Sequence, residues 1–137
     1  MSDLSPARRC LAALDLTDLS DAADEASLDA LCDRAQTIYG PVAAICVWPR
    51  FVERARSRLE GTGIKVATVA NFPDGGEDAA ALRREIEAAV DAGAEEIDVV
   101  IPWRAILGDR METAIAALEA GRSEEHTSEL QSQQAIS

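Results

Sequence analysis

Runs of branched apolar residues, each followed by a helical pattern, constrain this chain more than any other feature of its sequence. Strands are expected at Val42–Val47, Lys65–Ala70 and Ile97–Ile101, and a shorter one at Leu14–Leu16. The pattern recurs at steps of roughly 25 residues, which is typical of a βα repeat. Strands in such repeats lie parallel and are joined by right-handed crossovers. We therefore expect four parallel strands flanked by helices on one side.

Helix signals occupy the segments between these strands. Asp24 is an N-cap candidate for a helix that should end at Gly40-Pro41. Further helices are expected to begin at Pro49, to span Glu77–Ala92, and to begin near Met111. The apolar stripe of the helix that follows Asp24 consists of Leu28, Leu31, Cys32, Ala35 and Ile38.

Two architectures contain such a repeat: an open doubly wound sheet and part of a (β/α)8 barrel. No Gly-rich dinucleotide fingerprint follows the first strand, which argues against a nucleotide-binding open sheet. In both architectures the functional residues gather at the C-terminal ends of the strands. Cys46, Asn71 and Asp98 lie at or near those ends.

Asp98 breaks the most apolar part of the last strand, between Ile97 and Val99. An isolated ionised carboxylate in such a place costs several kcal/mol of desolvation. Along a strand, Asp98 shares one face with Val100, whereas its two neighbours point to the other face. The residues leave two interpretations open: a carboxylate bonded to nearby backbone, or a functional one with a shifted pKa.

Composition limits the classes of partner. Hydrophobic residues make up 47% and charged residues 28% of the chain, as in globular proteins. The net charge of −12 disfavours nucleic acid and anionic membranes as partners, and no apolar run is long enough to span a membrane. Three widely spaced Cys without an export signal predict reduced thiols and a cytoplasmic protein. No Cys/His cluster has the spacing of a zinc site, and no cofactor is indicated.

The last segment departs from the βα pattern. From Arg122 to Ser137 the sequence is polar, has no apolar stripe, and resembles the translation of a sequencing-adapter read-through. We interpret residues 1–121 as the domain and residues 122–137 as a non-native tail, with a natural disordered tail as the alternative. The single histidine, His126, falls in this tail and is not assigned a catalytic role.

Four blocks of sequence carry a resemblance to a known family. They are Leu14–Thr17, Ala44–Phe51, Val69–Gly75 and Glu96–Val100, and in this order and separation they resemble the N-terminal half of deoxyribose-phosphate aldolase. The resemblance implies a (β/α)8 barrel, present here as a half-barrel of about four βα units. It also implies a Schiff-base aldolase that reversibly cleaves 2-deoxy-D-ribose 5-phosphate to acetaldehyde and D-glyceraldehyde 3-phosphate without metal or cofactor.

The resemblance implies roles for five residues. Asp98 matches the family's proton-moving carboxylate, and Asp15, Thr17, Cys46 and Asn71 match positions of the substrate pocket. Simpler interpretations stay open for the pocket positions. Asp15 and Thr17 could cap the following segment, Cys46 could be a small buried apolar residue, and Asn71 could close its own turn.

One part of the family's site has no counterpart in this sequence. The resemblance implies that both catalytic lysines and the phosphate-binding loops come from the second half of the barrel. Lys65 is the only lysine, and it lies at the start of a strand, away from the active face. We therefore expect the isolated chain to be inactive toward its small phosphorylated sugar or aldehyde substrate. The alternative is a non-enzymatic half-barrel that binds a small ligand or a partner chain through its open edges. Formation of a homo-oligomer is also left open.

Overall fold

In the computed structural model, which describes residues 5–122, four parallel strands form one sheet in the order β1-β4-β5-β6. The register places Thr17 opposite Cys46, Cys46 opposite Ala67, and Ala67 opposite Glu96. The four predicted parallel strands are therefore confirmed, with small shifts at their ends. The strands are β1 (Asp15–Asp18), β4 (Ala44–Val47), β5 (Lys65–Ala70) and β6 (Glu96–Val99).

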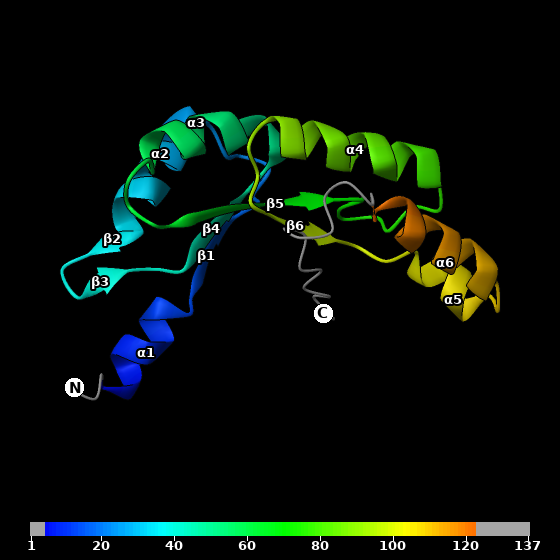
Figure 1. Ribbon diagram of the computed structural model, residues 1–137, viewed down its shortest axis with the longest axis horizontal. Helices are drawn as coiled ribbons and strands as arrows, with labels where there is room; N and C mark the ends of the chain where they lie inside the picture. Colours follow the sequence, from blue (N-terminus) through cyan, green and yellow to red (C-terminus); the bar gives the residue numbers. More distant parts are fainter. Residues whose placement is uncertain (1–4, 123–137) are drawn as a thin grey trace.

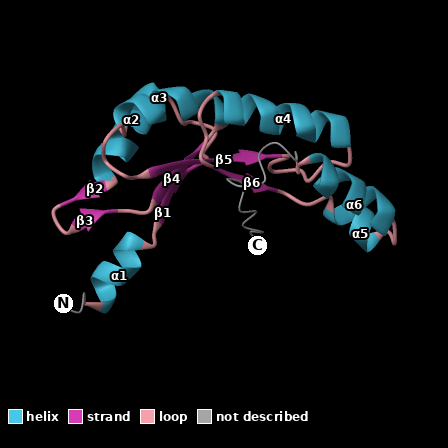
Figure 2. Ribbon diagram, viewed as in Figure 1, coloured by secondary structure: helices cyan, strands magenta, loops and turns pink. Residues whose placement is uncertain are grey.

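Helices α2, α3 and α4 lie along one face of this sheet, as Figure 1 shows. No helix of the described part covers the opposite face in the same way (Figure 2). The prediction of helices on one side is thus confirmed for the helices between strands. The helical segments are α1 (Pro6–Ala12), α2 (Glu25–Arg34), the 3₁₀ turn η1 (Pro49–Phe51), α3 (Val52–Arg58), α4 (Ala79–Asp91), α5 (Trp103–Leu107) and α6 (Met111–Ala120).

Local hydrogen bonds explain where the longer helices begin. At α2, the Asp24 carboxylate accepts from the Ser27 backbone N–H, and the Ser27 hydroxyl accepts from the Asp24 backbone N–H, a reciprocal capping box. At α4, the Asp78 carboxylate accepts from the backbone N–H of Ala81, so this helix begins after Asp78 rather than at the predicted Glu77. Both caps satisfy backbone donors that the helix itself leaves free.

The prediction for the end of α2 is wrong. The helix ends at Arg34, and a two-stranded hairpin follows, made of β2 (Gln36–Thr37) and β3 (Gly40–Pro41). Ile38, assigned to the apolar stripe of the helix, is 91% exposed at the tip of this hairpin. The turn is closed by the Thr37 hydroxyl, which donates to the Gly40 carbonyl at 2.7 Å, and by the positive φ of Gly40.

The core lies between the sheet and its helices. Around β4 and β5, Ile45 and Val66 pack with Leu31 of α2 and Val52 of α3. A second apolar cluster joins β6 to helices α4 and α6, and its buried members are Ala70, Leu82, Ile86, Ala89, Ile97 and Ala117. Burial of the apolar side chains in these two clusters is the main stabilising contribution to the fold.

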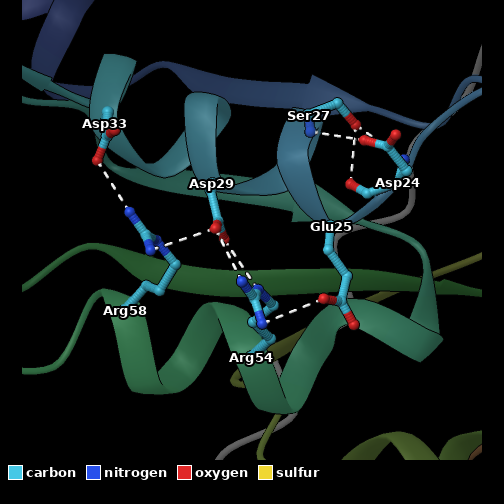
Figure 3. A network of polar contacts seen from close by, with 7 residues as sticks. All are labelled: Asp24, Glu25, Ser27, Asp29, Asp33, Arg54 and Arg58. Carbon is cyan, nitrogen blue, oxygen red and sulfur yellow. Dashed lines mark hydrogen bonds and ion pairs between the residues drawn. The ribbon is translucent and has the colours of Figure 1, made fainter.

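An ion-pair network links α2 to α3 on the outer surface (Figure 3). Arg54 donates two hydrogen bonds to the Asp29 carboxylate, at 2.9 and 2.8 Å, and lies 3.3 Å from Glu25. Arg58 lies 3.3 Å from both Asp29 and Asp33. All of these side chains except Asp29 are exposed, so the ion pairs contribute little to the free energy of unfolding.

Candidate active site

The face of the sheet opposite the helices carries most of the candidate site residues. Successive side chains of a strand alternate between the two faces. Ile45, Val47 and Val66 pack with the helices, so Cys46 and Ala67 point to the other face. There, Cys46, Ala67 and Val69 form a separate small cluster, joined by Leu19 and Trp48 and by no helical residue. We call the positions on this side, Asp15, Thr17, Cys46, Ala67, Val69, Glu96 and Asp98, the open face.

Strand pairing brings four of the predicted site residues together on the open face. Thr17 and Cys46 are direct partners across β1 and β4. Asp98 pairs with Val69 of β5. Val69 lies two residues further along its strand than Ala67, which is the partner of Cys46. Asp15 begins β1 on the same face as Thr17, and both side chains are exposed. Asp15, Thr17, Cys46 and Asp98 thus lie on one face of the sheet.

Asp98 lies on β6, the last strand of the described sheet. Within the described residues β6 pairs with β5 alone, and of its four residues only Ile97 is buried. Asp98 is half-buried, and this partial burial, together with the nearby Asp15 carboxylate, raises the pKa of the Asp98 side chain. A carboxylate whose charged form is destabilised in this way is suited to exchange protons.

Glu96 is a fourth polar member of the open face that the sequence prediction missed. It lies two residues before Asp98 on β6 and pairs with Ala67. Desolvation, followed by the carboxylates of Asp15 and Asp98, raises the pKa of Glu96. The signal was the alternation itself, because a residue two positions from Asp98 on a strand must share its face. Three carboxylates therefore influence one another across the open face.

Cys46 lies among these carboxylates. Burial, together with the negative charges of Asp98, Asp15 and Glu96, raises the pKa of the Cys46 thiol to about 12. The thiol is therefore protonated at neutral pH and does not serve as a nucleophile, because the reactive form of cysteine is the thiolate. Its packing with Ala67 and Val69 agrees with the simpler interpretation of a small buried side chain.

Asn71 follows β5 and is engaged in the loop that leads to α4. Its side-chain amide donates to the carbonyl oxygens of Gly76, at 2.8 Å, and Val100, at 2.9 Å. Its backbone N–H donates to the Glu85 carboxylate at 2.7 Å, and its φ of +59° is left-handed. Asparagine tolerates this conformation better than most residues. Asn71 thus ties the β5–α4 loop to the end of β6.

Gly75 lets the same loop pack closely against the segment after β6. It adopts a φ of +64°, and a Cβ at this position would lie 2.6 Å from the Ile101 carbonyl oxygen and 2.7 Å from Trp103. Only glycine fits both the conformation and the space. Gly75 thus allows the loop between β5 and α4 to lie against the segment that follows β6.

Aromatic side chains join the loops at the C-terminal ends of the strands. Trp48, just after β4, meets Phe72, just after β5, in an edge-to-face contact with ring centres 5.5 Å apart. The indole N–H of Trp48 donates to the Ser20 carbonyl, beyond the end of β1, at 3.1 Å. These contacts form one side of the rim above the open face.

Lys65 lies at the opposite end of the sheet. It is the first residue of β5, and its Nζ is 3.6 Å from the Glu95 carboxylate, which also pairs with Arg56 at 2.9 Å. The prediction that this amine lies at the start of a strand is confirmed, and the register places it level with Asp15, four residues before Val69, the partner of Asp98. Within residues 5–122, no group of three or more His, Cys, Asp or Glu is placed to hold a metal ion. No helix in that range is long and apolar enough to cross a membrane.

Comparison with known proteins identifies the same architecture. Residues 9–132 match the model of the DeoC/LacD family aldolases. The deoxyribose-phosphate aldolase of Agrobacterium fabrum is 46% identical over 112 residues, a match that covers 80% of this chain and 42% of that protein. A Coccidioides immitis protein, solved as a candidate deoxyribose-phosphate aldolase, superimposes with a TM-score of 0.79 at 30% identity, covering 84% of this chain and 45% of that one.

A more distant structure shares the fold alone. The Aeropyrum pernix deoxyribose-phosphate aldolase, described as a tetramer, has a TM-score of 0.62 at 24% identity and covers 86% of this chain and 51% of its own. These structures decide between the two architectures in favour of part of a (β/α)8 barrel. The chain spans less than half the length of the Agrobacterium relative. Its match to the family model over residues 9–132 shows that the chain belongs to the DeoC/LacD aldolase family.

Proposed function

We propose that this chain is the N-terminal half of a deoxyribose-phosphate aldolase barrel, with Asp98 as its proton-moving residue. The reaction is the reversible cleavage of 2-deoxy-D-ribose 5-phosphate to acetaldehyde and D-glyceraldehyde 3-phosphate. The observation that supports this most strongly is the position of Asp98, half-buried beside Asp15 on the open face and with a raised pKa. The identity to the Agrobacterium aldolase supports the same assignment.

The chemistry of a Schiff-base aldolase explains why a carboxylate is needed there. A lysine amine adds to the substrate carbonyl and loses water, which leaves an iminium that accepts the electron pair of the breaking carbon–carbon bond. Protons must leave and return at each stage, and a carboxylate with a pKa raised toward neutrality performs this transfer well. Asp98 is the half-buried carboxylate of the open face nearest the C-terminal end of its strand.

The other open-face residues shape the pocket in this proposal. Asp15 and Thr17 present exposed polar side chains from β1, and Cys46 supplies a neutral, protonated thiol on its floor. Asn71 contributes by fixing the loop over the pocket. Because the reaction needs neither metal nor cofactor, the protein groups and bound water supply all of the proton transfer. Three free cysteines in the described part agree with a cytoplasmic location.

The Schiff-base lysine must come from outside this sequence. Lys65 is its only lysine and pairs with Glu95 at the N-terminal end of β5, away from Asp98. We therefore infer that the isolated chain does not turn over substrate. The second candidate function, a non-enzymatic half-barrel that binds another chain, is favoured by one observation: β1 and β6 each pair on one side alone within residues 5–122.

The test is a chimeric barrel. Residues 5–121 replace the matching part of the Agrobacterium aldolase, and borohydride trapping with 2-deoxyribose 5-phosphate is followed by mass spectrometry. We expect turnover and one covalent adduct on a lysine contributed by the relative, and no stoichiometric adduct on the isolated chain. A folded chimera with neither turnover nor adduct would contradict the aldolase assignment. A stoichiometric adduct on Lys65 would contradict the assignment of the lysine to the missing half.

A further inference from the structure

Two side chains from the first turn of α5 donate to one backbone carbonyl in the loop between β5 and α4. The guanidinium of Arg104 donates to the Asp74 carbonyl oxygen at 2.8 Å, and the indole N–H of Trp103 donates to the same oxygen at 3.2 Å. The Arg104 guanidinium also lies over the Trp103 ring, 4.1 Å from its centre, which holds the two donors side by side. Two donors satisfy both lone pairs of this carbonyl. We call these three groups the Asp74 clamp.

The Asp74 clamp holds the turn that carries Phe72. This turn is closed by a hydrogen bond from the Gly75 backbone N–H to the Asn71 carbonyl oxygen, at 2.9 Å. Its start is fastened to the end of β6 by the Asn71 side chain, and Asp74 is fastened to α5 by the clamp. Phe72 lies between these two attachments, and its ring forms part of the rim above the open face. The position of Phe72 therefore depends on both attachments.

The contacts of Arg104 differ from those of a residue that stabilises the core. Arg104 is exposed, and within residues 5–122 its guanidinium contacts a loop carbonyl and an aromatic ring rather than an ion-pair partner. A charged donor holds a carbonyl more firmly than a neutral donor does. Loss of Arg104 should therefore release the turn without removing a buried apolar contact.

We propose that Arg104 is a positioning residue for substrate binding, which acts through the Asp74 carbonyl to hold Phe72 at the rim above the open face. This inference rests on the proposed function, because it takes the open face to receive the sugar substrate. Arg104 does not touch the reacting atoms, and Asp98 is placed by its strand pairing with Val69 rather than by the clamp. A displaced rim weakens binding of the ground state and the transition state alike, which raises KM and leaves kcat nearly the same.

The test compares three variants in the chimeric barrel with 2-deoxyribose 5-phosphate. Arg104→Met keeps the aliphatic stem and removes the donors and the charge, and we expect KM to rise about five- to twentyfold with kcat within about threefold. Arg104→Lys keeps a charged donor and should restore most of this loss. Arg84→Met is the matched control, because Arg84 is exposed on α4 and carries the same charge. The control should behave like the unmodified chimera.

Unphosphorylated 2-deoxyribose separates positioning from direct binding of the phosphate. An arginine that contacts the phosphate loses its effect when the substrate has none, whereas an arginine that positions Phe72 keeps its effect. We therefore expect Arg104→Met to lower kcat/KM by the same factor for both substrates. A loss confined to the phosphorylated substrate would overturn the proposal. A fall in kcat with unchanged KM, or failure of Arg104→Lys to restore binding, would overturn it as well.

Hydrogen exchange of the chain itself tests the clamp without turnover. The Gly75 amide, which donates within the turn, should exchange about tenfold faster in Arg104→Met than in the unmodified chain or in Arg84→Met. The amides of β5 should exchange at the same rate in all three proteins. Equal exchange at Gly75 in all three would overturn the proposal. An unmodified chimera without turnover would contradict the proposed function instead, while the exchange rates would still decide whether Arg104 holds the turn.

Discussion

The two faces of the sheet differ sharply although the same strands build them. On the face covered by helices, Ile45, Val66 and Ile97 are buried against α2, α3 and α4. On the open face lie Cys46 and Asp98, the sequence neighbours of Ile45 and Ile97. Burial and nearby carboxylates raise the pKa of both side chains. One residue along a strand separates a side chain that stabilises the fold from one that is suited to chemistry. The alternation of a strand thus separates core residues from the proposed site residues within a single run of sequence.

This division predicts its largest effect for a core truncation on the covered face. Ile45 is completely buried, so Ile45→Ala should lower the free energy of unfolding by about 2–5 kcal/mol. Thr17→Ala, at an exposed open-face position of the adjacent strand, should change it by less than about 0.5 kcal/mol. Urea unfolding followed by circular dichroism measures both. Similar losses in the two variants would show that the open face is itself part of the core.

The loop after β5 should show an intermediate effect. Asn71→Ala removes two side-chain hydrogen bonds to Gly76 and Val100 and places alanine at a positive φ. We expect a loss of about 1–3 kcal/mol in stability, since the two carbonyl groups lose their donors. Asn71→Gly, which relieves the backbone but not the hydrogen bonds, separates the two causes. If both variants are as stable as the unmodified chain, Asn71 does not stabilise the loop, and only its proposed role in the pocket is left.

Removal of a charge from the open face should raise the free energy of unfolding rather than lower it. The pKa of Asp98 is raised on folding, so the folded state binds this proton more tightly than the unfolded state does. The contribution of Asp98 to stability therefore falls as pH rises from its unfolded pKa through its folded pKa. Asp98→Asn should stabilise the chain at pH 7, by roughly 0.5 kcal/mol for a partly exposed position. The gain should disappear below about pH 4.

Thermal melts of the unmodified chain and the Asp98→Asn variant across pH 3–8 give this difference directly. Glu96→Gln should show the same sign, because desolvation and the same neighbours raise the pKa of Glu96. A variant that is less stable than the unmodified chain at pH 7 would mean that Asp98 is held by favourable interactions, as in the simpler interpretation of a backbone-bonded carboxylate.

The smallest effect is expected on the outer surface, in the network between α2 and α3. Hydrogen bonds from Arg54 lower the pKa of Asp29, so this pair stabilises the folded state above the unfolded pKa of Asp29 and ceases to do so as pH falls. Asp29→Asn should therefore destabilise the chain slightly at pH 7 and not at low pH. Melts in 1 M salt provide the control, because exposed pairs are screened there. A loss that persists in high salt would indicate a packing role for Asp29.

The sequence was most informative where local pattern and tertiary structure agree. The apolar runs predicted β4, β5 and β6, and the position of Asp98 within an apolar run left a shifted pKa as one of two interpretations. The prediction for Ile38 was wrong. The helical spacing of apolar residues continues to Ile38, but the helix ends earlier, before the turn between Thr37 and Gly40. A five-residue helix such as α5 carries too few turns to show a period.

The candidate site residues came from resemblance rather than from local pattern. Resemblance supplied Asp15, Thr17, Cys46, Asn71 and Asp98, and strand pairing then placed four of them on one face. The engagement of Asn71 by Gly76 and Val100 depends on contacts between residues distant in sequence, which no local pattern encodes. The edge position of β6, and hence the partial exposure of Asp98, likewise follows only from the order of strands.

The most direct test of the central claim, that the open face carries the chemistry through Asp98, is the turnover of the chimeric barrel with Asp98→Asn. The change keeps the shape of the side chain and removes its proton transfer. We predict that kcat falls by about 10²–10⁴ while the melting temperature is unchanged or higher, because general acid–base catalysis contributes a factor of that size. Unchanged turnover in a folded Asp98→Asn chimera would contradict the claim and leave Asp98 as a carboxylate of the sheet without a role in proton transfer.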